Sequence, residues 1–88
     1  MTKSTYVLLF GKLRQYVSSG RLNMVISPEM TPQEFREAVA LEIARLCPAF
    51  PGVSELKSSA VATDRLLGEG ETIGEAIEVS LLPPVCGG

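Results

Sequence analysis

The chain contains no histidine and no tryptophan, and it has only two cysteines, Cys47 and Cys86. Without histidine it lacks the commonest general base and the commonest metal ligand. Two cysteines this far apart match no zinc-site spacing and form no disulfide framework, so we expect a reducing cytoplasm and no bound metal. The apolar run over residues 5–10 ends at Gly11 and Lys12, too early for a signal peptide or a membrane span. We therefore expect no membrane association.

Acidic side chains are missing from residues 1–28, which carry Lys3, Lys12, Arg14 and Arg21. All ten acidic residues lie from position 29 onward, and the net charge is −2. Basic residues this sparse, with few aromatic residues between them, argue against a nucleic-acid partner. They are suited to steering a protein partner, although a solvated surface accounts for most such charges.

The length of 88 residues and a hydrophobic content of 45% indicate one globular domain with a single core. Apolar patterns predict strands over residues 5–10, 22–27, 59–63 and 77–82, with a short strand or bridge at 66–67. The first strand is apolar throughout, which predicts cover on both faces. Leu22, Met24 and Ile26 share one face of the second.

A helix is predicted to begin at Thr31, which can cap it, followed by Pro32 in the first turn and Glu34 to complete a capping box. It should end near Cys47, because Pro48 disfavours helical geometry in the preceding residue. Its core stripe is predicted to consist of Phe35, Val39, Ile43 and Leu46.

The predicted order is strand, strand, helix, one or two short strands, strand. One helix packed on one face of a mixed sheet buries these patterns economically, which gives an α+β, β-grasp fold. The first and last strands, being the most apolar, should be central. Residues 48–59 form a loop, and Ile73 should hold the polar segment 68–76 against the core.

Residues 82–88 form a tail that follows a domain of residues 1–81. No side chain from residue 79 onward is charged, so the expected charge there is the carboxylate of Gly88. Pro83 and Pro84 favour an extended rod, and Gly87 and Gly88 can enter a slot too narrow for a Cβ. At about 3.3 Å per residue the tail reaches about 20 Å. It suits delivery of a carboxylate into another protein, although proline and glycine are also common in ordinary chain ends.

Two stretches support a resemblance, LFGKLR over residues 9–14 and LLPPVCGG over residues 81–88. The chain resembles ubiquitin-like sulfur carriers, most closely the small subunit of molybdopterin synthase, the MoaD family. The first stretch is similar to that family's strand-exit motif and is weakly specific, whereas the second matches its tail in position and composition.

The resemblance implies that a ubiquitin-activating-type adenylyltransferase uses ATP to adenylate Gly88. A sulfur donor protein then converts the carboxylate to a thiocarboxylate. The tail enters the large synthase subunit and gives its sulfur to a cyclic pyranopterin. This chain would bind no cofactor and catalyse nothing alone, and it has no phosphate-binding glycine loop of its own.

The resemblance also places a set of side chains on the partner-binding surface, namely Phe10, Arg14, Leu82, Pro83, Pro84, Val85 and Cys86. Phe10 is equally well explained as core and Arg14 as a solvated charge, and Leu82 could instead complete the packing of the last strand. The usual Gly-Asp-Glu turn before the last strand is absent, and Gly74 is expected to supply its positive φ. Cys86 stands where the family has a small non-thiol residue; it fits as a small side chain or, as a hypothesis, exchanges sulfur with Gly88.

Other functions remain open. Carriers for thiamine thiazole synthesis, tRNA thiolation or cysteine synthesis share the Gly-Gly end. A ubiquitin-like modifier would join Gly88 to lysines, and a plain β-grasp binding module would have an inert tail.

Overall fold

The computed structural model describes residues 2–83, which form one mixed sheet and one main helix. The elements are β1 (Lys3–Leu9), η1 (Gly11–Gln15), β2 (Arg21–Ile26), α1 (Pro32–Leu46), η2 (Val53–Leu56), β3 (Ala60–Ala62) and β4 (Glu78–Leu82). The strand order is β2-β1-β4-β3. β1 pairs antiparallel with β2 and parallel with β4, and β3 pairs antiparallel with β4. The predicted β-grasp arrangement, with the first and last strands central, is confirmed.

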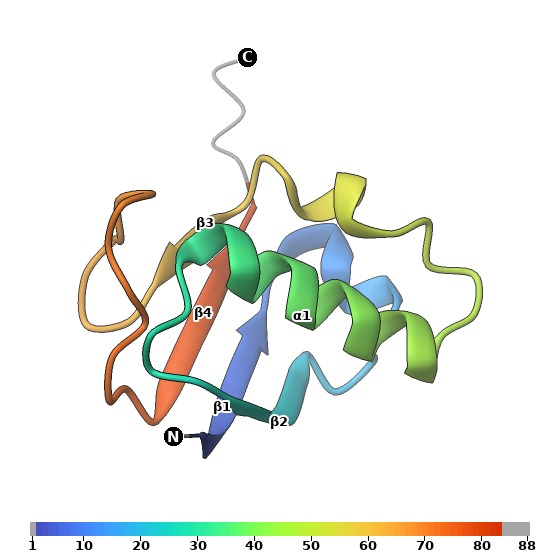
Figure 1. The fold of residues 1–88 in the computed structure, drawn as a ribbon. Coiled ribbons are helices and arrows are strands. Elements are labelled where there is room, and N and C mark those ends of the chain that lie inside the picture. Colours follow the sequence, from blue (N-terminus) through green and yellow to red (C-terminus); the bar gives the residue numbers. More distant parts are fainter. Residues whose placement is uncertain (1, 84–88) are drawn as a thin grey trace.

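Helix α1 crosses one face of the sheet, and the core lies between them (Figure 1). Phe35, Val39 and Ile43 of the helix are fully buried against β1 and β4 residues such as Val7 and Val79. Burial of this apolar area is the main force that holds the helix on the sheet.

Local signals fix both ends of α1. The amide of Glu34 donates to the Thr31 hydroxyl, and the amide of Thr31 donates to the Glu34 carboxylate, so the predicted capping box is present. At the other end Cys47 has extended backbone angles and Pro48 follows it.

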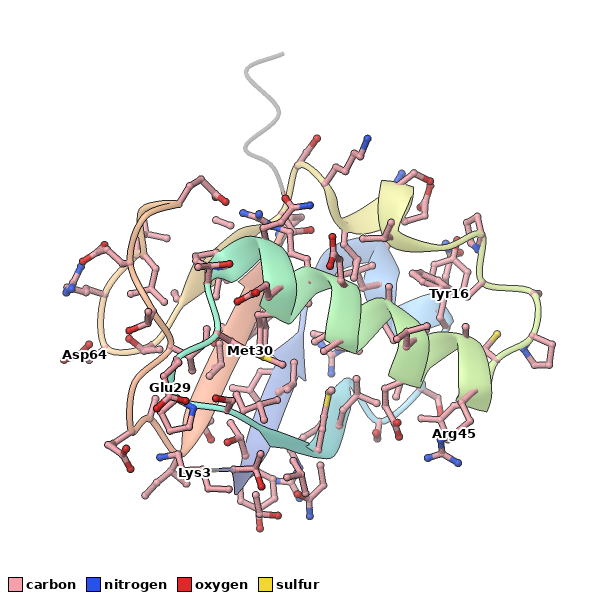
Figure 2. The ribbon with its side chains drawn as sticks, in the orientation of Figure 1. Lys3, Tyr16, Glu29, Met30, Arg45 and Asp64 are labelled. Carbon is pink, nitrogen blue, oxygen red and sulfur yellow. The ribbon has the colours of Figure 1, made fainter. Side chains whose placement is uncertain are left out.

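The prediction that Leu46 completes the core stripe is wrong. Its side chain is 49% exposed, and the core cluster at this end includes Phe50 from the following loop. Phe50 packs edge-on against Tyr16, with ring centroids 5.0 Å apart. Figure 2 shows Tyr16 at the side of the molecule where α1 ends. Phe50 of the loop, packed on Tyr16, therefore covers this end of the core in place of Leu46.

The prediction that the first strand is covered on both faces is also wrong. Val7 and Leu9 are buried beneath α1, whereas Tyr6 is 39% exposed and Leu8 is half-buried on the opposite face. In the part of the chain that the structure describes, α1 covers one face of the sheet and nothing comparable covers the other. We call this second face the open face.

The long segment between β3 and β4 is held by backbone hydrogen bonds. The predicted bridge is present between Ala62 and Leu66. Ile73 is buried, as the sequence predicted. Its amide also donates to the carbonyl of Met30 (2.9 Å). Gly74 has the expected positive φ, +71°. Within residues 2–83 no helix has the length and apolar character needed to cross a membrane.

Candidate docking site where β4 ends

The last residues of β4 set the position from which the chain leaves the sheet. Leu81 pairs with Leu9 on one side and Val61 on the other, and Leu82 pairs with Ala60. Pro83 has no amide hydrogen with which to extend the ladder, and β4 ends just before it. The strand is thus held from both sides up to its last residue.

Gly11 allows the chain to pass close to this exit. Its φ is +64°, a left-handed conformation that other residues adopt at a cost. A Cβ at position 11 would lie 3.2 Å from Cγ of Pro83 and 3.3 Å from its Cβ. The Pro83 ring therefore packs directly on the Gly11 backbone. Sequence reasoning used this glycine only as part of a motif; its position directly after a strand was the available signal for a close approach.

Phe10 and Leu82 lie side by side on the open face. The parallel register puts both of them one residue beyond the Leu9–Leu81 pair. The backbone of Phe10 is extended, so the alternation of β1 continues and Phe10 shares a face with Leu8. Phe10 is 37% exposed and Leu82 is half-buried. The explanation of Phe10 as a core residue is therefore wrong, and both apolar side chains are accessible beside Pro83.

Arg14 comes from η1, whose buried Leu13 holds this short 3-10 helix against the core. The guanidinium of Arg14 lies against the backbone of Gly20, because a Cβ at position 20 would be only 2.7 Å from Nε of Arg14. Gly20 also has a positive φ, +70°. A larger residue at position 20 would displace Arg14.

Arg21, at the start of β2, was not predicted as a site residue. Its guanidinium carbon lies 4.9 Å from the ring centroid of Tyr6, which is cation–π geometry. The Ser19 hydroxyl donates to the carbonyl of Arg21 (3.0 Å), which helps to fix the strand start. The register pairs Arg21 with Leu8 and Tyr6 with Asn23, so Arg21 and Tyr6 are diagonal neighbours on the open face.

A shallow hollow of about 360 Å³ joins these features. We define the hollow by the residues that line it, from the end of β1, η1 and the turn before β2: Leu8, Leu9, Phe10, Arg14, Ser19, Gly20 and Arg21. The hollow combines apolar leucine side chains, the aromatic ring of Phe10 and the guanidinium groups of Arg14 and Arg21. Aromatic residues and arginine are enriched in protein–protein interfaces.

The two arginines of the hollow differ from the other arginines of the described residues. Arg36, Arg45 and Arg65 each form an ion pair with a glutamate. Among residues 2–83, no carboxylate lies within ion-pair distance of Arg14 or Arg21. Their positive charges are therefore available to an incoming group.

Four of the predicted partner-binding residues fall in one area: Phe10, Arg14, Leu82 and Pro83. The others, Pro84, Val85 and Cys86, and the predicted reactive residues Gly87 and Gly88, lie outside the described residues. The docking and transfer roles assigned to all of them stay predictions.

The topology and the single helix place this chain among proteins with the ubiquitin-like β-grasp fold. Among solved structures it is similar to SAMP1 from Haloferax volcanii, with a TM-score of 0.63 and 20% sequence identity over 98% of this chain and all of that one. It is also similar to a second crystal structure, of H. volcanii small archaeal modifier protein 1, with a TM-score of 0.59 and 18% identity over 93% of this chain and 98% of that one. No protein-family model and no curated protein sequence matches the chain.

Proposed function

We propose that this chain is a sulfur carrier, the small subunit of a molybdopterin synthase. In this function the carboxylate of Gly88 attacks the α-phosphate of ATP on an activating adenylyltransferase and releases pyrophosphate. A sulfur donor then displaces AMP and leaves a thiocarboxylate. In the large synthase subunit that sulfur bonds to a carbon of the pyranopterin, and water then hydrolyses the bond between the Gly88 acyl carbon and sulfur, which leaves sulfur on the pterin and returns the carboxylate.

One observation supports the proposal most strongly: the described chain ends in a central strand whose exit is fixed by the packing of Pro83 on Gly11. A fixed exit lowers the conformational entropy lost when the following residues enter a partner's active site. The accessible Phe10 and Leu82 beside it provide apolar area for that partner to bury.

The sequence of the tail supports molybdopterin synthesis over the other carrier pathways. LLPPVCGG resembles the tail of the molybdopterin synthase small subunit, whereas thiazole-pathway carriers lack the Pro-Pro-Val segment. Lys, Arg and His side chains that could compete for an activated carboxylate are absent from residues 79–88.

A ubiquitin-like protein modifier is the second candidate, and the fold comparison favours it. One of the similar structures is named a small archaeal modifier protein. A modifier and a carrier share the adenylation step and differ in the nucleophile that follows, a lysine amine in the first and sulfur in the second. Similarity of fold at 20% sequence identity is compatible with both functions and does not distinguish them.

Intact-mass measurement tests the proposal. The purified chain is incubated with an adenylyltransferase from the same organism, ATP and a sulfur donor, and a chain lacking Gly88 is the matched control. The expected result is exchange of one oxygen for sulfur on the C-terminal peptide, in the full chain alone. Lysine conjugates without this exchange would establish the modifier instead, and an unchanged Gly88 with an active enzyme would reject both functions.

The acceptor is tested with the large synthase subunit and the cyclic pyranopterin. We expect the thiocarboxylate chain to be consumed and the carboxylate chain to be regenerated as dithiolene forms. A thiocarboxylate that persists with an active large subunit would exclude molybdopterin synthesis and direct attention to another sulfur acceptor.

A further inference from the structure

Arg14 and Arg21 approach the hollow from different elements, and each contacts a neighbouring group other than a carboxylate. Arg14, from η1, lies on the backbone of Gly20. Arg21, from β2, lies over the ring of Tyr6 at 4.9 Å. A guanidinium held over an aromatic ring, as that of Arg21 is, keeps the N–H donors at its edge available.

The other arginines of the described residues show the contrasting arrangement. Arg36 donates through both terminal nitrogens to Glu69, and Arg65 donates in the same way to Glu71. Arg45 donates through Nε and Nη2 to Glu42. In these three the edge donors are already used, so they have little left to offer a partner.

On the open face Glu78 lies beside Tyr6, but within residues 2–83 it forms no ion pair with Arg21. Glu78 opens β4 opposite Tyr6, whereas Ser80 and Leu82 follow toward the exit. Across β1, Leu8 and Phe10 are apolar, and residues 11–21 contain no acid. The local charge at the hollow is therefore positive and is not balanced within its own surface.

We propose that Arg21 and Tyr6 belong to the docking surface of the activating partner and that Arg21, together with Arg14, receives acidic side chains of that partner. The inference rests on the proposed function, because it assigns the chemistry of a partner that the proposed function requires. The matching surface carries carboxylates that meet the two guanidinium edges, next to an apolar area that covers Phe10 and Leu82.

The physical basis is electrostatic complementarity combined with preorganisation. A carboxylate accepts two parallel N–H bonds from one guanidinium, which fixes orientation as well as affinity. Because contact with the Tyr6 ring already restricts the Arg21 side chain, less entropy is lost when it binds. Attraction between opposite charges also raises the association rate and makes it sensitive to salt.

The test measures adenylation of the chain as the substrate of the activating enzyme, at low and high salt. Arg21→Glu is expected to raise KM about tenfold or more with little change in kcat, because it affects docking and not the reacting carboxylate. Arg21→Lys keeps the charge and should recover most of the affinity. Tyr6→Leu should raise KM about threefold, since it removes only the stacking surface of Arg21.

Arg45→Glu is the matched control, with the same change of charge on α1, the layer on the opposite side of the sheet. Figure 2 shows Arg45 at the end of the helix. It should leave KM within about twofold of the unchanged chain. The salt dependence of KM should shrink in Arg21→Glu and persist in Arg45→Glu, a difference that a merely structural effect would not produce.

The outcomes separate the two proposals. If the unchanged chain is adenylated but Arg21→Glu and Arg45→Glu raise KM equally, the docking role of Arg21 is overturned and the proposed function stands. If the unchanged chain is never adenylated, the proposed function fails and the inference fails with it. If sedimentation shows a dimer that Arg21→Glu dissociates, a second copy covers the hollow and the partner assignment is wrong.

Discussion

The arginines of this domain lie in two regions that differ in how their charge is neutralised. On the side of α1 and the segment between β3 and β4, arginines are paired with glutamates, and the pair of Arg36 with Glu69 connects distant parts of the chain. At the hollow, Arg14 and Arg21 have no such partner among residues 2–83; Arg14 lies beside the Gly20 backbone and Arg21 over the Tyr6 ring.

This difference indicates which arginines stabilise the folded structure. Arg36 is 7% exposed, and its Nε donates to the carbonyl of Ser59 while its other nitrogens bind Glu69. Ser59 directly precedes β3, whose Ala60 pairs with Leu82. Arg36 therefore helps to hold the edge strand that flanks the exit, whereas Arg14 and Arg21 form no ion pair with any other part of residues 2–83.

The largest expected effect on stability comes from removing Arg36, the buried arginine of the region in which arginines pair with glutamates (the paired region). Arg36→Ala should lower the free energy of unfolding by about 2–4 kcal/mol, because it leaves the Ser59 carbonyl buried without its donor and removes the packed side-chain stem. Arg14→Ala and Arg21→Ala should stay within about 0.5 kcal/mol. Urea unfolding of the three variants measures this. Equal losses in all three would remove the distinction between the regions.

An intermediate effect is expected at Gly11, where the exit is held without any charge. Gly11→Ala should cost about 1–2 kcal/mol for the positive φ and about 1 kcal/mol further for the contact with Pro83. Gly74→Ala is the matched control, because Gly74 has a φ of +71° and nothing within 4 Å of a Cβ placed there. Thermal or urea unfolding should therefore show a larger loss for Gly11→Ala, and changing Pro83 to alanine as well should reduce the excess. Identical losses at the two glycines would mean that the Pro83 contact contributes nothing.

The smallest expected effect is the pH dependence of the paired region. Hydrogen bonds from Arg65, and then from the amide of Gly68, lower the pKa of Glu71 to about 2. The hydrogen bonds from Arg36 likewise lower the pKa of Glu69. Since the folded pKa of Glu71 is below the unfolded one, its stabilisation is present above about pH 4.5 and is lost as the pH falls toward about 2.

Unfolding measured across that window should therefore show stability falling with pH. Glu71→Gln and Arg65→Gln should each flatten the same part of the profile, because they remove opposite halves of one pair. Arg14→Gln and Arg21→Gln should leave the profile unchanged. A flattened profile in either of the latter would reveal a carboxylate partner at the hollow.

Signals that act over a few residues were sufficient to predict most of the fold. The capping box of Thr31 and Glu34, the alternation of Leu22 and Ile26, and the apolar last strand depend on neighbours in the sequence. They fixed the order of elements and hence the topology. Leu46 and the open face of β1 were mispredicted because their exposure depends on what other segments cover, and periodicity does not contain that information.

The candidate site was predicted only in part for the same reason. Phe10 and Leu82 follow from a motif and a strand pattern, and both are accessible. The contact of Gly11 with Pro83 and the stacking of Arg21 on Tyr6 require the parallel register of β1 with β4 and the hairpin register of β1 with β2. A sequence pattern predicts that strands pair but leaves the register to tertiary packing.

The parallel pairing of β1 with β4 also has a mechanical consequence. Because the strands run in the same direction, the described chain starts at one end of the sheet and leaves β4 at the other (Figure 1). A pull on the chain beyond Pro83 acts along β4, so the ladders to β1 and β3 are loaded together in shear instead of being opened one hydrogen bond after another. We therefore expect the domain to stay folded when a partner that binds the chain beyond Pro83 exerts a force on it.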